Sequence, residues 1–160
     1  MTGRVGPVAR ALGYAGLLPQ AAAVAMLAAT RWVEGAPNDP GLPVAVAVVY
    51  PLVILSFLGG MWWGFAMRRG EGQGRLAAVA VTPSLAALAL FATLAATAQV
   101  GWSLIAVGGA VMLTLLVDRR LVATGEAPDG WMRLRVPLSL GLGGLTILAG
   151  VLVGGPVTGF

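Results

Sequence analysis

The chain has 160 residues, of which 58% are hydrophobic and only 10% are charged, and its mean hydropathy is +0.90. A soluble domain carries about 25% charged residues, so this composition excludes a soluble globular protein and indicates an integral membrane protein. Cysteine and histidine are absent, which excludes disulfides, Cys/His metal sites, iron–sulfur clusters and histidine-ligated haem.

Five apolar stretches approach or exceed the roughly 20 residues that a helix needs to cross a bilayer. They predict an all-α integral membrane protein, a bundle of five transmembrane helices in one domain that covers residues 1–160. The predicted helices are residues 11–30, 44–67, 76–98, 102–117 and 134–153.

Two residues mark the middle of the first predicted helix. Pro19 has no N–H and clashes with the preceding turn, so a kink is expected there. Gln20 carries an amide that needs a hydrogen-bond partner in hydrocarbon, which predicts that this side of the helix faces the bundle.

Small residues at four-residue spacing predict close helix packing in two places. Ser56, Gly60 and Gly64 lie on one side of the second predicted helix, and Gly150 and Gly154 repeat this spacing in the fifth. We expect the kinked first helix to dock on the side that carries Ser56, Gly60 and Gly64.

That docking would bring three polar side chains together. Tyr14 and Gln20 of the first helix would meet Ser56 of the second. The sequence therefore predicts a small polar pocket between the first two helices, suited to a quinone or a lipid headgroup.

The arginines predict the orientation of the bundle. With the N-terminus in the cytoplasm, nine of the ten arginines fall in inner segments and only Arg31 falls outside. Positive charge gathers on the cytoplasmic side of membrane proteins, so five spans with the N-terminus inside and the C-terminus outside are expected. The same distribution explains the net charge of +4 without nucleic acid as a partner.

The tryptophans all fall near the ends of predicted helices. Such positions are typical of interfacial anchors in an aromatic belt. The five predicted anchors are Trp32, Trp62, Trp63, Trp102 and Trp131.

All six acidic residues fall in predicted loops. They are Glu34, Asp39, Glu71, Asp118, Glu126 and Asp129. Ion-coupled transporters usually keep an ionisable group within the membrane, so this distribution disfavours a pump or symporter. No catalytic constellation and no metal motif accompany these carboxylates, and neither a reaction nor a cofactor is expected.

One group of charges is predicted to lie together at the inner interface. Its members are Asp118, Arg119, Arg120, Arg133 and Arg135. The group is interpreted either as a site for an anionic lipid headgroup or as positive-inside anchoring with a local Asp–Arg pair.

Three motifs resemble one family. They are residues 12–19 (LGYAGLLP), residues 54–60 (ILSFLGG) followed by Trp63-Gly64, and Asp118-Arg119-Arg120 followed by Pro128, Trp131 and Leu134-Arg135. The resemblance is to the small membrane proteins related to transmembrane protein 69, found in bacteria and mitochondria. It implies a multi-span inner-membrane protein and carries no established activity.

Together these observations predict a non-enzymatic, multi-pass protein of the bacterial inner membrane. The first hypothesis is an accessory or assembly subunit of a membrane complex, and a homo-oligomer is compatible with it. The alternative is a binder or transporter of a quinone or lipid that uses the pocket between the first two helices.

Overall fold

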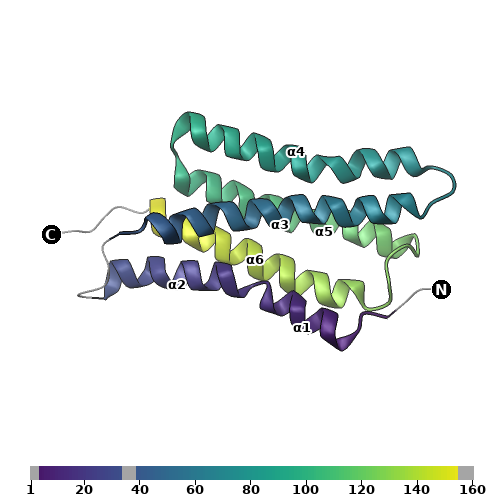
Figure 1. The fold of residues 1–160 in the computed structure, drawn as a ribbon, viewed down its shortest axis with the longest axis horizontal. Helices are drawn as coiled ribbons and strands as arrows, with labels where there is room; N and C mark the ends of the chain where they lie inside the picture. The colour runs from purple at the N-terminus through teal and green to yellow at the C-terminus, as the bar shows by residue number, and fades with distance from the viewer. Residues whose placement is uncertain (1–3, 34–38, 155–160) are drawn as a thin grey trace.

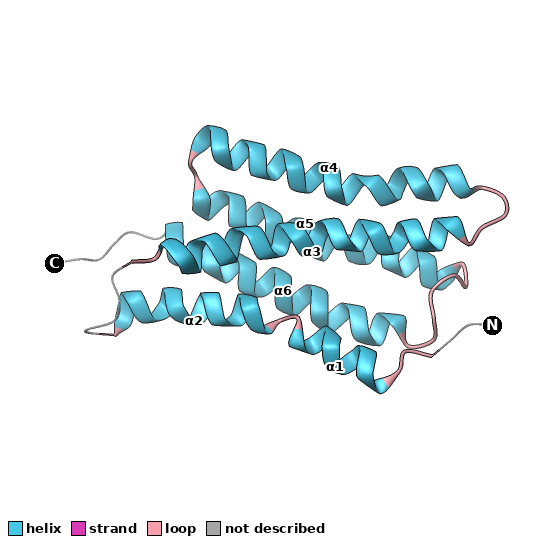
Figure 2. Cartoon of the chain, viewed as in Figure 1, coloured by secondary structure: helices cyan, strands magenta, loops and turns pink. Residues whose placement is uncertain are grey.

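The computed structural model describes residues 4–33 and 39–154, and within them the chain forms six helices (Figures 1 and 2). Glu34 lies outside the described residues. The helices are α1 (Pro7–Ala15), α2 (Leu18–Trp32), α3 (Gly41–Met67), α4 (Gln73–Thr97), α5 (Val100–Ala123) and α6 (Trp131–Gly154).

The helices α1 and α2 are the two halves of the first span, separated at Gly16 and Leu17. Pro19 sits in the first turn of α2, where its missing N–H costs nothing, so the chain breaks just before it. The break leaves the main-chain oxygen of Gly16 outside the helical ladder, and the Tyr50 hydroxyl of α3 donates to it. The predicted kink therefore takes the form of a break tied to α3.

Within the described residues, five helical segments are long and apolar enough to cross a membrane, with α1 and α2 counted as one. This confirms the prediction that the described chain is all-α, and it is consistent with the predicted bundle of five spans. Figure 1 shows α3 running beside α4, and α6 passing beside α5 and α2. The helix α4 packs mainly on α3 and forms the outer edge of the bundle.

Arginines gather at the end of the bundle where α1 begins and where α3 joins α4 and α5 joins α6. We call it the arginine-rich end. The arginines there are Arg4, Arg10, Arg68, Arg69, Arg75, Arg119, Arg120, Arg133 and Arg135.

Two helices are longer at this end than the apolar pattern predicts. The helix α5 continues to Ala123, six residues beyond its expected end, and α6 begins at Trp131, three residues before its expected start. Asp118 therefore lies inside a helix and, like Arg135 of α6, is buried in the bundle, so the expectation that every acidic residue lies in a loop is wrong for Asp118.

Glycines let α5 and α6 approach backbone to backbone. A Cβ atom built on Gly108 would lie 2.6 Å from the main-chain oxygen of Gly143. Nearer the other end, a Cβ atom on Gly150 would lie 2.6 Å from the main-chain oxygen of Gly101. Atoms do not approach so closely, so any side chain at these positions would separate the two helices.

Candidate functional site

An ion pair is buried between α5 and α6 near the arginine-rich end. Asp118 is 0% exposed and Arg135 is 6% exposed, and Arg135 Nε donates to Asp118 Oδ2 over 2.8 Å. A charge in this setting is stable only with a counter-charge and enough hydrogen bonds. Asp118 of α5 and Arg135 of α6 are each other's counter-charge, so the first requirement is met.

Two tryptophans and a threonine complete the hydrogen bonding of this pair. The indole nitrogens of Trp62 (α3) and Trp131 (α6) donate to Asp118 Oδ1 over 3.0 and 3.2 Å. Arg135 Nη2 lies 3.4 Å from the hydroxyl of Thr114. We call these five residues the ion-pair network, and they tie α3, α5 and α6 together.

This network corrects the expected interfacial charge group. Its two central members, Asp118 and Arg135, are buried, whereas Arg119, Arg120 and Arg133 are exposed. The helical period explains the separation, because Asp118 follows Val111 and Thr114 along the buried side of α5. Residues 119 and 120 are rotated by about 100° and 200° from that side.

The ion-pair network also corrects the prediction of five interfacial anchors. Trp62 is buried and Trp131 is partly buried, and the indole N–H of each donates a hydrogen bond to Asp118. Only Trp32, Trp63 and Trp102 are exposed at the surface, where an aromatic belt would need them.

A cavity of about 430 Å³ lies between α1, α3 and α6, next to the ion-pair network. We call it the α1–α3–α6 cavity. Its apolar lining includes Leu12, Leu17, Ile54, Phe57, Leu58, Met61, Leu134 and Leu138. Its size suits a small amphipathic molecule or part of a larger one.

Buried polar groups border this otherwise apolar cavity. Ser139 lines it and is 1% exposed, and its hydroxyl has no hydrogen-bond partner among the described residues. Arg135 also lines it, and its hydrogen bonds within the described chain engage Nε and Nη2 and leave Nη1 free. A buried hydroxyl without a partner costs about 1–3 kcal/mol, so this position favours a ligand that bonds to it.

The structure does not bring together Tyr14, Gln20 and Ser56, the residues of the predicted polar pocket. Tyr14 is exposed on α1. The Ser56 hydroxyl lies 2.8 Å from that of Ser84, because this side of α3 faces α4 and not the first span. The cavity that does form lies on another side of α3 and is lined by two hydroxyl-bearing residues, Tyr50 of α3 and Ser139 of α6.

Gln20 faces the bundle, as its amide requires. Its Nε2 donates to the Thr146 hydroxyl over 3.1 Å and approaches the main-chain oxygen of Ala47 at 3.4 Å. Its Oε1 has no partner among the described residues. Gln20 therefore links α2 to α3 and α6 at a distance from Ser56.

The glycines predicted for helix packing fall into two groups. Gly150 and Gly154 of α6 lie against Gly101 of α5. Gly60 and Gly64 are exposed on α3, and a Cβ atom on either would meet nothing within 4 Å. The first span therefore does not dock on the expected side of α3.

The close contact on α3 is made by the neighbouring glycine. A Cβ atom on Gly59 would lie 2.4 Å from the main-chain oxygen of Ala80 in α4. One residue along a helix is a rotation of 100°, which separates Gly59 from the exposed Gly60.

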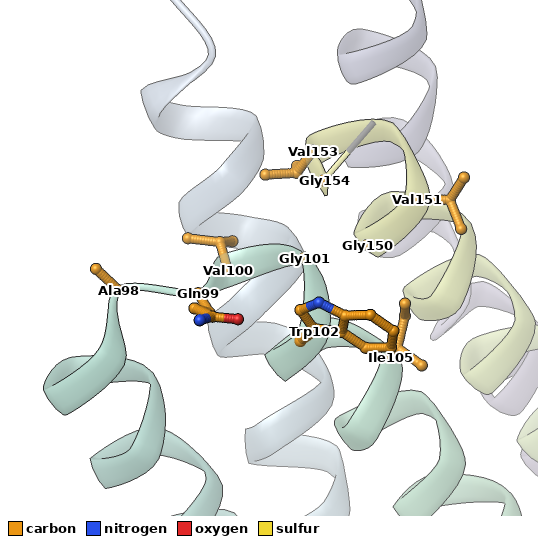
Figure 3. A pocket seen from close by; sticks show the side chains of 10 residues that line it. All are labelled: Ala98, Gln99, Val100, Gly101, Trp102, Ile105, Gly150, Val151, Val153 and Gly154. Carbon is orange, nitrogen blue, oxygen red and sulfur yellow. The ribbon is translucent and has the colours of Figure 1, made fainter. Parts of the chain in front are cut away.

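A second cavity, of about 480 Å³, lies at the opposite end of the bundle (Figure 3). Its walls come from the α4–α5 turn, the first turns of α5 and the last turn of α6, where Gly101 faces Gly150 and Gly154. Two of its lining residues, Gln99 and Trp102, carry polar side-chain groups, and both residues are exposed. It lacks the buried polar group that distinguishes the α1–α3–α6 cavity.

A family model described as "Protein of unknown function (DUF3429)" matches residues 5–152 of the chain. The chain belongs to the DUF3429 family. The match covers every described helix except the last two residues of α6. Neither a curated protein nor a solved structure matches the chain. The likeness to transmembrane protein 69 stays a prediction.

Sequence reasoning missed Thr114 and Ser139, two polar side chains of the site. A signal for them exists in the sequence. Arg135, Ser139, Leu142 and Thr146 follow at spacings of four, three and four residues, which places them on one side of α6. A polar residue that lies at helical spacing from buried leucines is on the same buried side of the helix, which indicates a polar contact inside the bundle.

Proposed function

We propose that this DUF3429 chain is a non-enzymatic membrane protein that binds a neutral amphipathic molecule in the α1–α3–α6 cavity. The observation that carries the proposal is the unpartnered hydroxyl of Ser139, buried at the wall of an apolar cavity of about 430 Å³. A ligand with an apolar body and one carbonyl oxygen would fill the cavity and pair with that hydroxyl. Quinones and uncharged lipids have this chemistry.

The charge balance of the site favours a neutral ligand. Arg135 borders the cavity, but Asp118 already compensates its charge at 2.8 Å. An anionic group would add a buried charge without a counter-charge, which is costly in a low dielectric. A carbonyl oxygen can accept a hydrogen bond from Nη1 or from the Ser139 hydroxyl without that cost.

The architecture supports entry from the side of the bundle. The helix α1 contributes no buried residue, and it is separated from α2 by the break at Gly16 and Leu17. Leu12 and Phe57 line the cavity and are also exposed, so the cavity meets the surface that the bilayer covers. A small rotation of α1 about the break would widen this opening.

The proposal includes a location and an orientation. Nine arginines at one end of the bundle and Arg31 at the end of α2 support a cytoplasmic N-terminus and an outward C-terminus in a bacterial inner membrane. Cysteine substitutions at Arg69 and Arg31, followed by labelling with an impermeant reagent in intact cells, test this. Labelling at position 69 and not at position 31 would overturn the orientation.

A short-chain quinone tests the ligand class, with the full chain in detergent micelles. Binding is read from quenching of tryptophan fluorescence, because Trp131 also lines the cavity. Replacing Ser139 by Ala should weaken binding by about three- to tenfold, the worth of one hydrogen bond. Replacing Ser139 by Leu should abolish binding by filling the space.

Ser103→Ala is the matched control, since Ser103 lies on α5 and does not line the cavity. Equal quenching in the wild type and in Ser139→Leu would overturn the proposed site. Tight binding of a fatty acid in place of the quinone would overturn the neutral ligand.

One observation favours a second function, that of an accessory subunit or a homo-oligomer. Gly60 and Gly64 form an exposed small strip on α3 with nothing packed against them. Small strips of this kind suit close contact with another membrane helix. Native mass spectrometry after mild solubilisation tests it: a defined partner or oligomer lost on Gly60→Leu supports the second function, and an unchanged monomer counts against it.

A further inference from the structure

Three arginines from separate parts of the chain meet at one cavity of the arginine-rich end. The cavity has a volume of about 320 Å³ and is lined by Arg4, Val5, Arg10, Asp129, Gly130 and Arg133. We call it the arginine cavity. It lies between the segment that precedes α1, the first turn of α1 and the start of α6.

Main-chain contacts hold these segments together. Arg4 and Asp129 form an isolated parallel bridge, and the Val5 amide donates to the main-chain oxygen of Asp129 over 3.3 Å. The bridge fixes the segment that carries Arg4 beside the start of α6, which carries Arg133. The arginines therefore meet because the backbone is joined there.

The arginine cavity carries an uncompensated positive charge. Three arginines and one acidic residue, Asp129, line it, and none of the three arginines forms an ion pair with a described residue. By contrast, Arg69 at the same end is paired with Glu126, and Arg135 is paired with Asp118. Like charges repel, so a cavity of this kind favours an anion with several acceptor oxygens.

We infer that the arginine cavity binds a phosphate group, and that the phosphate belongs to an anionic phospholipid. Guanidinium forks match the oxygens of phosphate and bond to them in pairs. The surface next to the cavity suits the rest of a lipid, because Val8 and Leu12 of α1 are 70% and 68% exposed. Acyl chains can lie along this apolar side of α1 while the headgroup sits on the arginines.

Native mass spectrometry of the full chain tests the inference, after reconstitution in phosphatidylcholine vesicles that contain one-fifth phosphatidylglycerol. The wild type should retain phosphatidylglycerol in preference to phosphatidylcholine. The double variant Arg10→Gln/Arg133→Gln should lose that preference by on the order of tenfold or more, since one hydrogen bond between a guanidinium and a phosphate is worth about tenfold or more in binding.

The matched control removes the same charge at the same end. Arg68→Gln/Arg119→Gln changes two exposed arginines that do not line the arginine cavity, and it should leave the preference within about twofold. An equal loss in both double variants would overturn the site, because it would show a diffuse surface attraction. No lipid preference in the wild type would overturn it as well.

A second measurement distinguishes the source of the phosphate. Thermal unfolding in a neutral detergent is followed with added phosphatidylglycerol or with millimolar inorganic phosphate. The inference expects stabilisation of the wild type by the lipid and little by the free ion. Equal stabilisation by inorganic phosphate would overturn the lipid as the ligand, and unchanged unfolding of the double variant without lipid shows that its fold is intact.

Discussion

Removing the charge of Asp118 should destabilise the bundle more than any other single isosteric change. In Asp118→Asn the Oδ1 oxygen still accepts from Trp62 and Trp131, but the new amide group faces Arg135 Nε. Arg135, only 6% exposed, then lies in the bundle without a counter-charge. Removal of one partner of such a pair costs about 3–5 kcal/mol, equivalent to more than a hundredfold in the folding equilibrium.

The double variant Asp118→Asn/Arg135→Gln should recover much of that loss. Both charges are then gone, and two amides can still bond to each other and to the indoles. The free energy of unfolding of the double variant should lie within about 1–2 kcal/mol of the wild-type value. The coupling energy between the two substitutions is then at least about 2 kcal/mol. Asp129→Asn, at an exposed carboxylate, should change stability by less than about 0.5 kcal/mol.

Reversible unfolding in mixed micelles measures these free energies. The transition is followed by far-ultraviolet circular dichroism, since the substitutions change the surroundings of two tryptophans and would disturb fluorescence. A loss below about 1 kcal/mol in Asp118→Asn would refute the reasoning. Losses that simply add in the double variant would show that the two residues act independently.

Three further changes follow from the packing and the loop contacts. Gly108→Ala places a methyl group 2.6 Å from a main-chain oxygen of α6 and should cost about 1–3 kcal/mol of unfolding free energy, whereas Gly60→Ala, with open space around it, should cost nothing. Tyr50→Phe removes the hydrogen bond to the main chain at the α1–α2 break and should speed hydrogen exchange in α1 with little change in α5. Hydrogen bonding from Arg69 lowers the pKa of Glu126, so the pair stabilises the chain fully above the ordinary glutamate pKa of about 4.3 and loses this effect as pH falls through the lowered value. The melting temperature of Glu126→Gln should lack this acid dependence, and an equal decline in both proteins would contradict the assignment.

The spans and the break at Pro19 could be predicted because each depends on residues close in sequence. A run of apolar residues sets the length of a helix, and a proline acts on its own turn. The amide of Gln20 also indicated correctly that its side of the helix faces the bundle, since a polar group in hydrocarbon needs a partner wherever that partner lies.

The site could not be predicted in the same way, because it joins residues that are far apart in the chain. Trp62 and Asp118 are 56 positions apart, and only the packing of α3 against α5 shows that the indole is used inside the bundle. A tryptophan near a helix end has the same local pattern whether it faces headgroups or a carboxylate. The error at Gly60 has another origin: two adjacent glycines, Gly59 and Gly60, leave the buried side uncertain by a rotation of 100°.

The position of α6 in the chain has a consequence for the order of assembly. This helix follows every element that it contacts, and it supplies the partners of polar groups made earlier: Thr146 for Gln20 and Arg135 for Asp118. Before α6 is in place, α3 can offer Gln20 the main-chain oxygen of Ala47 and Asp118 the indole of Trp62, but neither side chain has its full set of partners. Completion of α6 is therefore the step that supplies the counter-charge of Asp118 and the hydroxyl partner of Gln20.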